Sequence, residues 1–204
     1  MATRSNSSRE RILSCAEAII LKKGFSATTL EDIFKDAAIT KGGFFYHFDG
    51  KEALAEALVL RYLEQDDAIF EELSRQADAL SEDPLHRLLI FLKLLSEMMG
   101  NMHETHPGCL VASFTYENYQ LNDHIGDLMR LGIGNWNRMI MARLEQINEQ
   151  YETSGDTTPE TLAYMFTGII EGGILLARNF SNNQLLANQI LAYRSFIRLI
   201  YGAK

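Results

Sequence analysis

Apolar residues recur every three or four positions along most of the chain, without the strict alternation that indicates a β-strand. This spacing predicts amphipathic helices, each with one face buried in a core. Three prolines, Pro84, Pro107 and Pro159, stand at or near the starts of helical segments, where proline is tolerated. The pattern predicts an all-α protein of about nine helices. Its C-terminal bundle is expected to contain helices near 84–103, 108–120, 122–152, 159–179 and 182–201.

The first 50 residues predict three small helices. Ser7 and Ser8 can cap the first helix, which ends at Gly24, and the polar residues before them are expected to fray. Thr28 or Thr29 can cap the second helix, because two acidic residues follow and suit its positive end. A long amphipathic helix starts at residue 51 and connects this region to the bundle.

The segment TKGGFFYHFDGK, residues 40–51, combines two glycines with a run of rings. Helix interiors disfavour glycine by roughly 1 kcal/mol relative to alanine, so a bare backbone on a short helix needs a reason. Two short helices joined by a turn of three or four residues form a helix-turn-helix, whose second helix enters a DNA major groove. Gly42 and Gly43 would let that helix approach bases or phosphates closely. Phe44 and Phe48, four residues apart, are expected to face the small core.

Charge is distributed unevenly along the chain. The net charge is −8, which by itself points away from nucleic acid. Through Arg61, however, nine Lys and Arg stand against eight Asp and Glu, whereas the remainder holds ten against nineteen. A nearly neutral N-terminal quarter can therefore carry a local cationic face, while the acidic remainder limits nonspecific binding.

Ten residues of this region have a predicted role on DNA. Hydroxyl groups and rings with polar atoms suit phosphates, and Lys41 is the best-placed side chain for a base edge, most plausibly guanine O6 and N7. Lys51 adds a positive charge at the next helix start. The predicted DNA-binding residues are Thr28, Thr29, Thr40, Lys41, Gly42, Gly43, Phe45, Tyr46, His47 and Lys51.

The segment GFSATTLEDIFKDAAITKGGFFYHFDGKEAL resembles the N-terminal DNA-binding region of TetR-family transcriptional regulators, over roughly residues 9–58. Ala38 departs from the glycine that is usual in the turn, and Gly43 with Phe44-Phe45 departs from a commoner Thr/Ser-Leu/Ile-Tyr. The resemblance implies a helix-turn-helix domain over 1–50, a connecting helix over 51–75, and an effector-binding and dimerisation domain over 51–204. The matching residues are Gly24-Phe25, Thr28-Thr29, Ile33, Thr40-Lys41-Gly42, Tyr46-His47-Phe48 and Lys51-Glu52-Ala53-Leu54.

The last two helices carry apolar residues that predict a homodimer. Gly168 and Gly172 are four residues apart and would let two helices approach closely. Pairing with the same helices of a second chain would build a four-helix interface. It would also place two helix-turn-helix domains, here called reading heads, on an inverted-repeat operator. The alternative is that both helices pack within one monomer. The predicted interface residues are Leu162, Phe166, Ile169, Gly172, Leu176, Ile190, Tyr193, Ile197 and Tyr201.

Rings and thioethers among the central helices suit an adaptable pocket for a small, mainly apolar effector. Such an effector would release DNA by favouring a conformation with misplaced reading heads, and repression is the family's usual mode. The alternative is that these side chains simply fill the core. The predicted effector-binding residues are Phe91, Leu95, Met98, Met102, Cys109, Phe114, Glu117, Trp136, Met139, Phe166 and Arg178.

The run Pro-Gly-Cys-Leu, followed by Glu117, resembles a branch of the family in which a cysteine senses electrophiles or oxidants. Arg178 falls near the place of that branch's basic residue, and a nearby cation lowers a thiol's pKa. Modification of Cys109 is therefore one alternative trigger. The other interpretation of Cys109 is a small buried apolar residue with no sensing role. Another alternative function is a helical ligand carrier that does not bind DNA.

Several classes of protein are disfavoured. Two cysteines, Cys15 and Cys109, argue against a disulfide framework, and without a signal peptide or membrane span the chain is expected to be cytoplasmic. His103, His106 and Cys109 are spaced three apart, but Pro107 interrupts any common helix, so no metal site is expected. No arrangement of nucleophile and base suggests an enzyme, and no cofactor is expected.

Overall fold

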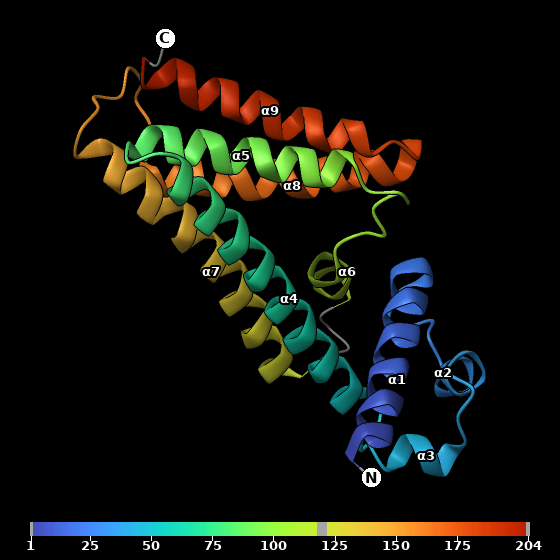
Figure 1. The fold of residues 1–204 in the computed structure, drawn as a ribbon. Coiled ribbons are helices and arrows are strands. Elements are labelled where there is room, and N and C mark those ends of the chain that lie inside the picture. The colour runs from blue at the N-terminus through green and yellow to red at the C-terminus, as the bar shows by residue number, and fades with distance from the viewer. Residues whose placement is uncertain (1, 118–121, 203–204) are drawn as a thin grey trace. The chain divides into compact units, whose positions relative to one another are not determined.

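The computed structural model describes residues 2–117 and 122–202, with side chains described from Ser7 onward. Within these residues all regular structure is helical, in agreement with the all-α prediction (Figure 1). The nine helices are α1 (Ala2–Lys23), α2 (Leu30–Asp36), α3 (Lys41–Phe45), α4 (Lys51–Leu80), α5 (Pro84–Gly100), α6 (Leu110–Tyr116), α7 (Asp123–Asn148), α8 (Pro159–Phe180) and α9 (Asn183–Ile200). The predicted end of the helix near 108–120 lies outside the described residues.

The chain divides into two compact units. One, here called the head unit, comprises residues 1–65 and 107–131; the other, the body unit, comprises 66–106 and 132–204. Helices α4 and α7 contribute residues to each unit. The head unit therefore holds α6 in addition to the three small helices, a grouping that the expected boundary at residue 50 does not include.

The first helix is longer than the sequence predicted. α1 begins at Ala2, so the expected cap at Ser7 and Ser8 and the frayed polar tail are wrong. No glycine or proline stands between Ala2 and Ser7, so the helix has no local signal that would stop it. The helix ends as predicted, at Gly24, whose φ of +86° is the left-handed conformation that glycine adopts readily.

The turn between α2 and α3 carries a strained residue. Ala38 has a φ of +49°, in the left-handed region where a Cβ is unfavourable. This is the position at which the resemblance leads one to expect glycine. The Ile39 amide donates to the Phe34 carbonyl at 3.0 Å and the Arg11 Nε donates to the Ala37 carbonyl at 2.8 Å, so the surrounding contacts hold the turn in place.

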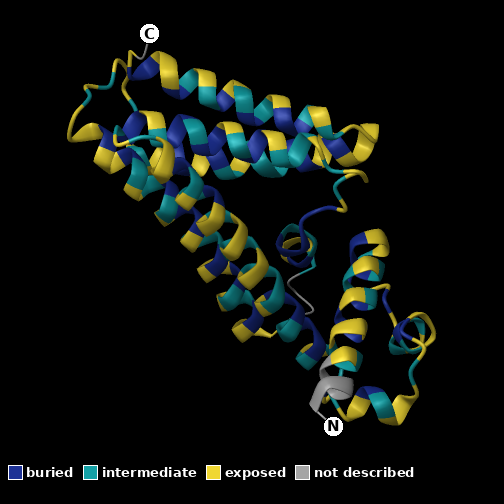
Figure 2. Cartoon of the chain, in the orientation of Figure 1, coloured by how far each residue is buried: buried dark blue, intermediate teal, exposed yellow. Residues whose placement is uncertain are grey.

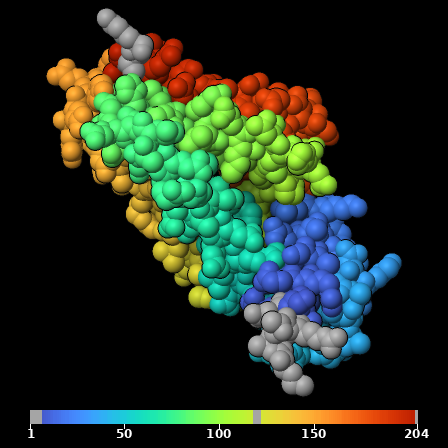
Figure 3. Space-filling model, in the orientation of Figure 1, coloured from blue at the N-terminus to red at the C-terminus, as the bar shows by residue number. Residues whose placement is uncertain are grey.

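In the body unit, α9 packs against α5 and α8 (Figures 1 and 3). The Tyr193 hydroxyl donates to the Leu162 carbonyl at 2.9 Å, and the Arg194 Nε donates to the Leu89 carbonyl at 2.8 Å. Buried and exposed positions recur along α9, as its 3.6-residue period requires (Figure 2). A Cβ at Gly173 would lie 3.2 Å from the Leu186 Cα, so glycine at this position permits the close approach of α8 and α9.

Helix α8 is long and apolar enough to cross a membrane by length and composition alone, contrary to the sequence-based expectation that no segment would be. A core helix of a soluble protein meets the same criterion. Leu162, Phe166 and Ala177 of α8 are buried in the body unit, which accounts for part of its apolar character.

Candidate DNA-binding interface and effector cleft

Helix α3 presents an open, largely uncovered surface. Lys41 and Gly42 are exposed, and a Cβ built on Gly42 would meet no atom of the described residues within 4 Å. Phe45 and Tyr46 expose 43% and 76% of their surface, large fractions for aromatic side chains. His47 is half-buried, with its ring against the edge of Tyr46 at a centroid distance of 4.9 Å.

The rings of this segment divide between core and surface as predicted. Phe44 is fully buried and Phe48 is 4% exposed. The Phe44 ring contacts those of Phe34 and Phe48, at centroid distances of 5.4 and 5.6 Å. The buried pair anchors α3 on the head unit, and the exposed rings remain available to a partner.

Three threonines that were predicted to contact DNA differ in what their hydroxyls can do. Thr40 caps α3 by accepting from the Gly43 N–H at 3.1 Å, which leaves its own hydroxyl proton for a phosphate oxygen. Thr29 caps α2 in a capping box with Asp32, and its hydroxyl both donates to and accepts from that residue. Thr28 is 1% exposed and donates to the Gly24 carbonyl, so a direct DNA contact by its side chain is contradicted.

Lys51 has a structural partner in place of solvent. Its ammonium donates to the Phe25 carbonyl at 2.5 Å and lies 4.2 Å from the centroid of the Phe25 ring. Burial lowers the pKa of Lys51, Glu117 opposes that shift, and Lys23 adds to it. Lys51 therefore helps to hold the turn between α1 and α2, a role that the sequence did not predict.

The carboxylate of Glu117, at the C-terminal end of α6, holds the same turn from another side. It accepts from the Phe25 N–H at 3.0 Å, from the Ser26 N–H at 2.7 Å, and from the Ser26 hydroxyl. Burial alone would raise the pKa of Glu117, but the hydrogen bonds from Ser26 and Phe25 and the charge of Lys51 outweigh it, and the net shift is downward. Glu117, which the sequence assigned to the effector site, is thus engaged by this turn within the head unit.

The turn leaves no room for a larger residue at its first position. A Cβ on Gly24 would lie 2.4 Å from Oε1 of Glu117. Phe114 of α6 also reaches this turn, with its ring edge on that of Phe25 at 5.2 Å. Glycine at position 24 therefore serves both the positive φ and the approach of the Glu117 carboxylate.

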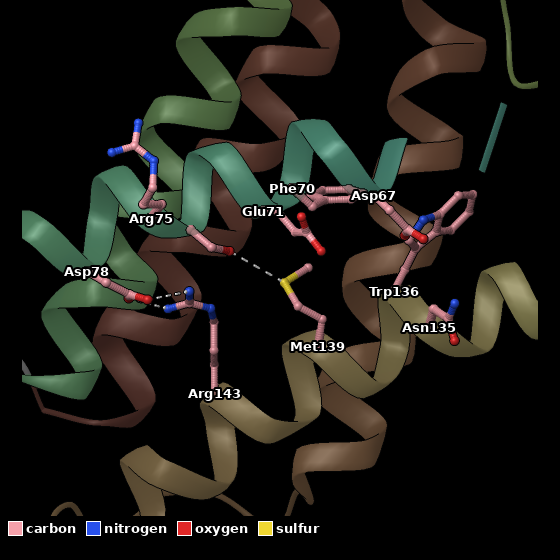
Figure 4. A pocket seen from close by; sticks show the side chains of 10 residues that line it. Asp67, Phe70, Glu71, Arg75, Asp78, Asn135, Trp136, Met139 and Arg143 are labelled. Carbon is pink, nitrogen blue, oxygen red and sulfur yellow. Dashed lines mark hydrogen bonds and ion pairs between the residues drawn. The ribbon is translucent and has the colours of Figure 1, made fainter. Parts of the chain in front are cut away.

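A cleft of about 630 Å³ lies in the body unit between α4 and α7 (Figure 4). Figure 4 shows Asp67, Phe70 and Glu71 of α4 on one side and Trp136 and Met139 of α7 on the other. The ring of Phe91, a buried residue of α5, lies 6.0 Å from that of Phe70. The lining residues are Asp67, Phe70, Glu71, Ser74, Arg75, Asp78, Asn135, Trp136, Met139 and Arg143.

Only part of the predicted effector set lines this cleft. Trp136 and Met139 do so, with the Met139 sulfur 3.9 Å from the Ser74 hydroxyl. Leu95 and Phe166 are core residues of the body unit, Met98 and Met102 are half-buried there, and Arg178 is exposed. Cys109, Phe114 and Glu117 belong to the head unit instead. The acidic residues of α4 escaped prediction because charged positions on an amphipathic helix ordinarily face solvent.

Most of the residues predicted to form the dimer interface are buried within the single chain. Leu162, Phe166, Ile190, Tyr193, Ile197 and Tyr201 are each no more than 4% exposed, which corrects their assignment to an interface and favours the monomer-packing alternative for these six. Ile169 is half-buried, whereas Gly172 and Leu176 are exposed. A different set of apolar residues faces outward: Tyr164, Met165, Leu175, Leu176, Phe180 and Leu199.

Both cysteines are thiols, Cys15 half-buried and Cys109 buried. Cys109 caps α6, with its sulfur accepting from the Ala112 N–H at 3.4 Å. His103 and His106 belong to the body unit and Cys109 to the head unit. Among the described residues no three His, Cys, Asp or Glu side chains are grouped as a metal would require.

A capped pair of short helices, with the second helix bare and exposed, defines a DNA-binding helix-turn-helix regulator. Two family descriptions match the chain: "Bacterial regulatory proteins, tetR family" over residues 12–58, and "Tetracyclin repressor-like, C-terminal domain" over residues 84–192. The chain belongs to the TetR family of transcriptional regulators, as the sequence resemblance predicted.

Known proteins agree with this assignment. The transcriptional regulator AcuR of Cereibacter sphaeroides is 31% identical over 161 residues, which is 78% of this chain and 71% of AcuR. The HTH-type transcriptional repressor DhaR of a Mycobacterium species is 24% identical over 183 residues, 87% of this chain and 86% of DhaR. A TetR-family regulator from Agrobacterium tumefaciens shares the fold, with a TM-score of 0.79, 23% identity, and coverage of 97% of this chain and 99% of that one.

Proposed function

We propose that this DNA-binding regulator is a homodimeric repressor that leaves an inverted-repeat operator when a small effector occupies the cleft between α4 and α7. The observation that carries the DNA contact is the open surface of α3, where a Cβ on Gly42 would have no atom within 4 Å in the described part of the chain. The proposed contacts are the Thr40 hydroxyl, Lys41, Gly42, Gly43, Phe45, Tyr46 and His47. The function is one of binding, and no step of it requires catalysis, a metal or a cofactor.

The outer face of α8 supports the dimer. Cβ atoms on Gly168 and Gly172 would meet no atom of the described residues within 4 Å, and Leu175 exposes 62% of its surface. A continuous apolar stripe with two glycines four residues apart permits close approach of a second helix. The stripe gives a reason for the exposed part of α8 that needs no membrane, and a second copy of this chain is its proposed occupant.

The cleft supports effector control. It combines two aromatic rings and a thioether with seven polar or charged side chains, in a volume suited to a small molecule. An effector that binds better to a conformation unable to place both heads on DNA would lower operator affinity by that difference. Because α4 contributes residues to both units, it is the proposed element through which the cleft and the head unit are coupled.

The test is a titration of the purified protein with duplexes tiled across the DNA that flanks its gene. A regulator of this kind is expected to select a segment with an inverted repeat, and the logarithm of its affinity should fall linearly with the logarithm of salt concentration. Failure to bind any duplex better than random DNA would refute the proposal and favour a ligand carrier.

A second candidate trigger is covalent modification of Cys109, favoured by the position of its thiol at the N-terminal cap of α6. A helix N-terminus stabilises a thiolate, which is the reactive form. The opposing observation is that Cys109 is 5% exposed. Alkylation kinetics of Cys109, measured with operator affinity in wild type and Cys109→Ser, decide the matter. An inert thiol, or a normal response in the variant, would reject it.

A further inference from the structure

The cleft between α4 and α7 carries two carboxylates without a basic partner. Asp67 and Glu71 lie one helical turn apart on α4, and within the described part of the chain neither forms an ion pair. Burial raises the pKa of Asp67, and the neighbouring charge of Glu71 raises it further. The cleft therefore holds negative charge that the fold does not neutralise.

The basic residues of the same cleft are already engaged. Arg143 makes two hydrogen bonds to the carboxylate of Asp78, at 3.0 and 3.3 Å, and its guanidinium lies 5.7 Å from the Phe91 ring centroid. Arg75 makes two hydrogen bonds to Glu72, at 2.9 and 2.6 Å. Figure 4 shows Arg75 pointing away from the α7 side of the cleft. Both cations are therefore already paired with carboxylates of the protein.

Aromatic surface and an unpartnered donor complete the site. The ring of Phe70 lies 6.4 Å from that of Trp136, and together they offer the electron-rich faces that attract cations. Trp136 is 8% exposed, and none of the residues that the structure describes accepts a hydrogen bond from its buried Nε1–H. Figure 4 shows this nitrogen on the side of the indole that faces Phe70 and Asp67. A buried donor of this kind normally has an acceptor, so this N–H is available to one that a ligand brings.

We infer that the effector of this cleft is an organic cation with an aromatic or apolar body and a hydrogen-bond acceptor. Asp67 and Glu71 would balance its charge, Phe70 and Trp136 would contact its body and its cationic group, and the Trp136 Nε1–H would donate to its acceptor. This inference rests on the proposed function. It narrows the class of effector to organic cations, whereas the sequence indicated only a mainly apolar molecule.

The test uses three probes of nearly the same shape: benzyltrimethylammonium, which is cationic, neopentylbenzene, which is neutral, and phenylmethanesulfonate, which is anionic. Trp136 is the single tryptophan of the chain, so its fluorescence reports occupancy of the cleft, and calorimetry gives an independent affinity. The cation is expected to bind at least about fivefold more tightly than either other probe, as one cation–π contact and two partly exposed carboxylates would provide.

The matched variants are the double substitution Asp67→Asn with Glu71→Gln, and the control Glu145→Gln on the exposed face of α7 outside the cleft. The double variant should lose the preference for the cation while it binds the neutral probe as before. The control should keep the preference. Both variants should melt no lower than wild type, since each change preserves shape and removes one or two negative charges from an acidic protein.

Acidification gives a second readout. The other charged groups that line the cleft are Glu71, Arg75 and Asp78 of α4 and Arg143 of α7, and of these Glu71 acts on Asp67. Because the pKa of Asp67 is raised above the ordinary value of 3.8, protons compete with the cation at a higher pH than at an ordinary aspartate. Affinity for the cation should fall as the pH is lowered toward that raised pKa, and this fall should be much smaller in the double variant.

Equal affinity for the three probes, tighter binding of the sulfonate, no cation binding at about 10 mM, or an unchanged preference in the double variant would each overturn the inference. These outcomes are independent of DNA. A protein that binds the cation but no duplex would refute the proposed function alone. A protein that binds its operator and shows no charge preference would refute this inference alone.

Discussion

At the scale of single residues, substitution of Ala38 tests directly whether the backbone of the turn between α2 and α3 is strained. Its methyl group is exposed and its φ is +49°, so Ala38→Gly removes an unfavourable conformation and loses no packing. The left-handed penalty for a residue with a Cβ exceeds the entropy cost of glycine, and we expect a gain of roughly 0.5–1 kcal/mol in the free energy of unfolding. Urea denaturation measures it.

Ala27 provides the matched control, since it is an exposed turn residue whose φ is not positive. Ala27→Gly should destabilise the protein, because glycine there adds only freedom to the unfolded chain. If Ala38→Gly is the less stable of the two variants, the strain at this turn has been misread.

Substitutions at two lysines of the head unit, Lys41 and Lys51, distinguish a DNA contact from a contact that stabilises the fold. Lys41→Ala should leave stability unchanged but alter base preference or reduce the salt dependence of operator binding, since Lys41 is exposed on α3. Lys51→Met retains an apolar stem over Phe25 but loses the donor to the Phe25 carbonyl, so it should cost about 1 kcal/mol of stability.

Salt titrations and thermal unfolding of both variants check this assignment. Lys51→Met should lower affinity for all duplexes without a change in the slope against salt. If Lys51→Met reduces the dependence of affinity on salt and leaves stability unchanged, Lys51 contacts a phosphate, as the sequence alone suggested.

At the scale of elements, α6 holds the turn between α1 and α2 through Glu117. The pKa of Glu117 is lower in the folded protein than its ordinary value of 4.5, so its ionised form stabilises the fold above that value. This stabilisation is lost as the pH falls through the lowered pKa. Glu117→Gln should therefore be less stable than wild type near neutral pH by about 1–2 kcal/mol, with the difference vanishing in acid.

Unfolding midpoints of wild type and Glu117→Gln between pH 7 and pH 3 measure this convergence. Glu52→Gln is the matched control, as Glu52 is exposed at the first turn of α4 in the same unit. A constant gap at all pH values would show that the charge of Glu117 is not what holds the turn. Operator affinity should fall together with stability, because α2 follows this turn directly.

At the scale of the whole molecule, the outer face of α8 decides whether two chains associate. Gly172→Leu adds a side chain where the described part of the chain has no atom within 4 Å, so the monomer should fold normally and gain helix propensity. Close approach of a second α8 would be blocked. We expect a monomer by sedimentation and a loss of affinity for an inverted repeat relative to a single half-site.

Ala142→Leu, on an exposed position of α7, adds comparable bulk away from this face and should remain dimeric. If Gly172→Leu stays dimeric at micromolar concentration, the proposed face is wrong and another surface of the chain must pair.

The periodicity of the chain predicted helices, their order and most of their ends, because one apolar face per helix is a local property. Phe44 and Phe48 were assigned correctly to the core for this reason. The same reasoning failed on which surface covers a given face. Ile190, Tyr193 and Ile197 form an apolar stripe on α9. The spacing of these residues does not indicate whether α5 and α8 or a second copy of the chain buries the stripe.

The sequence by itself determined the class of this protein, because capping residues, glycines and rings of the reading head act over a few neighbouring positions. Tertiary structure alone decided that Glu117 reaches Phe25 and Ser26, some ninety positions away in sequence. It also gathered Asp67, Glu71 and Trp136 into one cleft from two helices. Contacts of this range depend on how helices pack, and no spacing within a single helix encodes them.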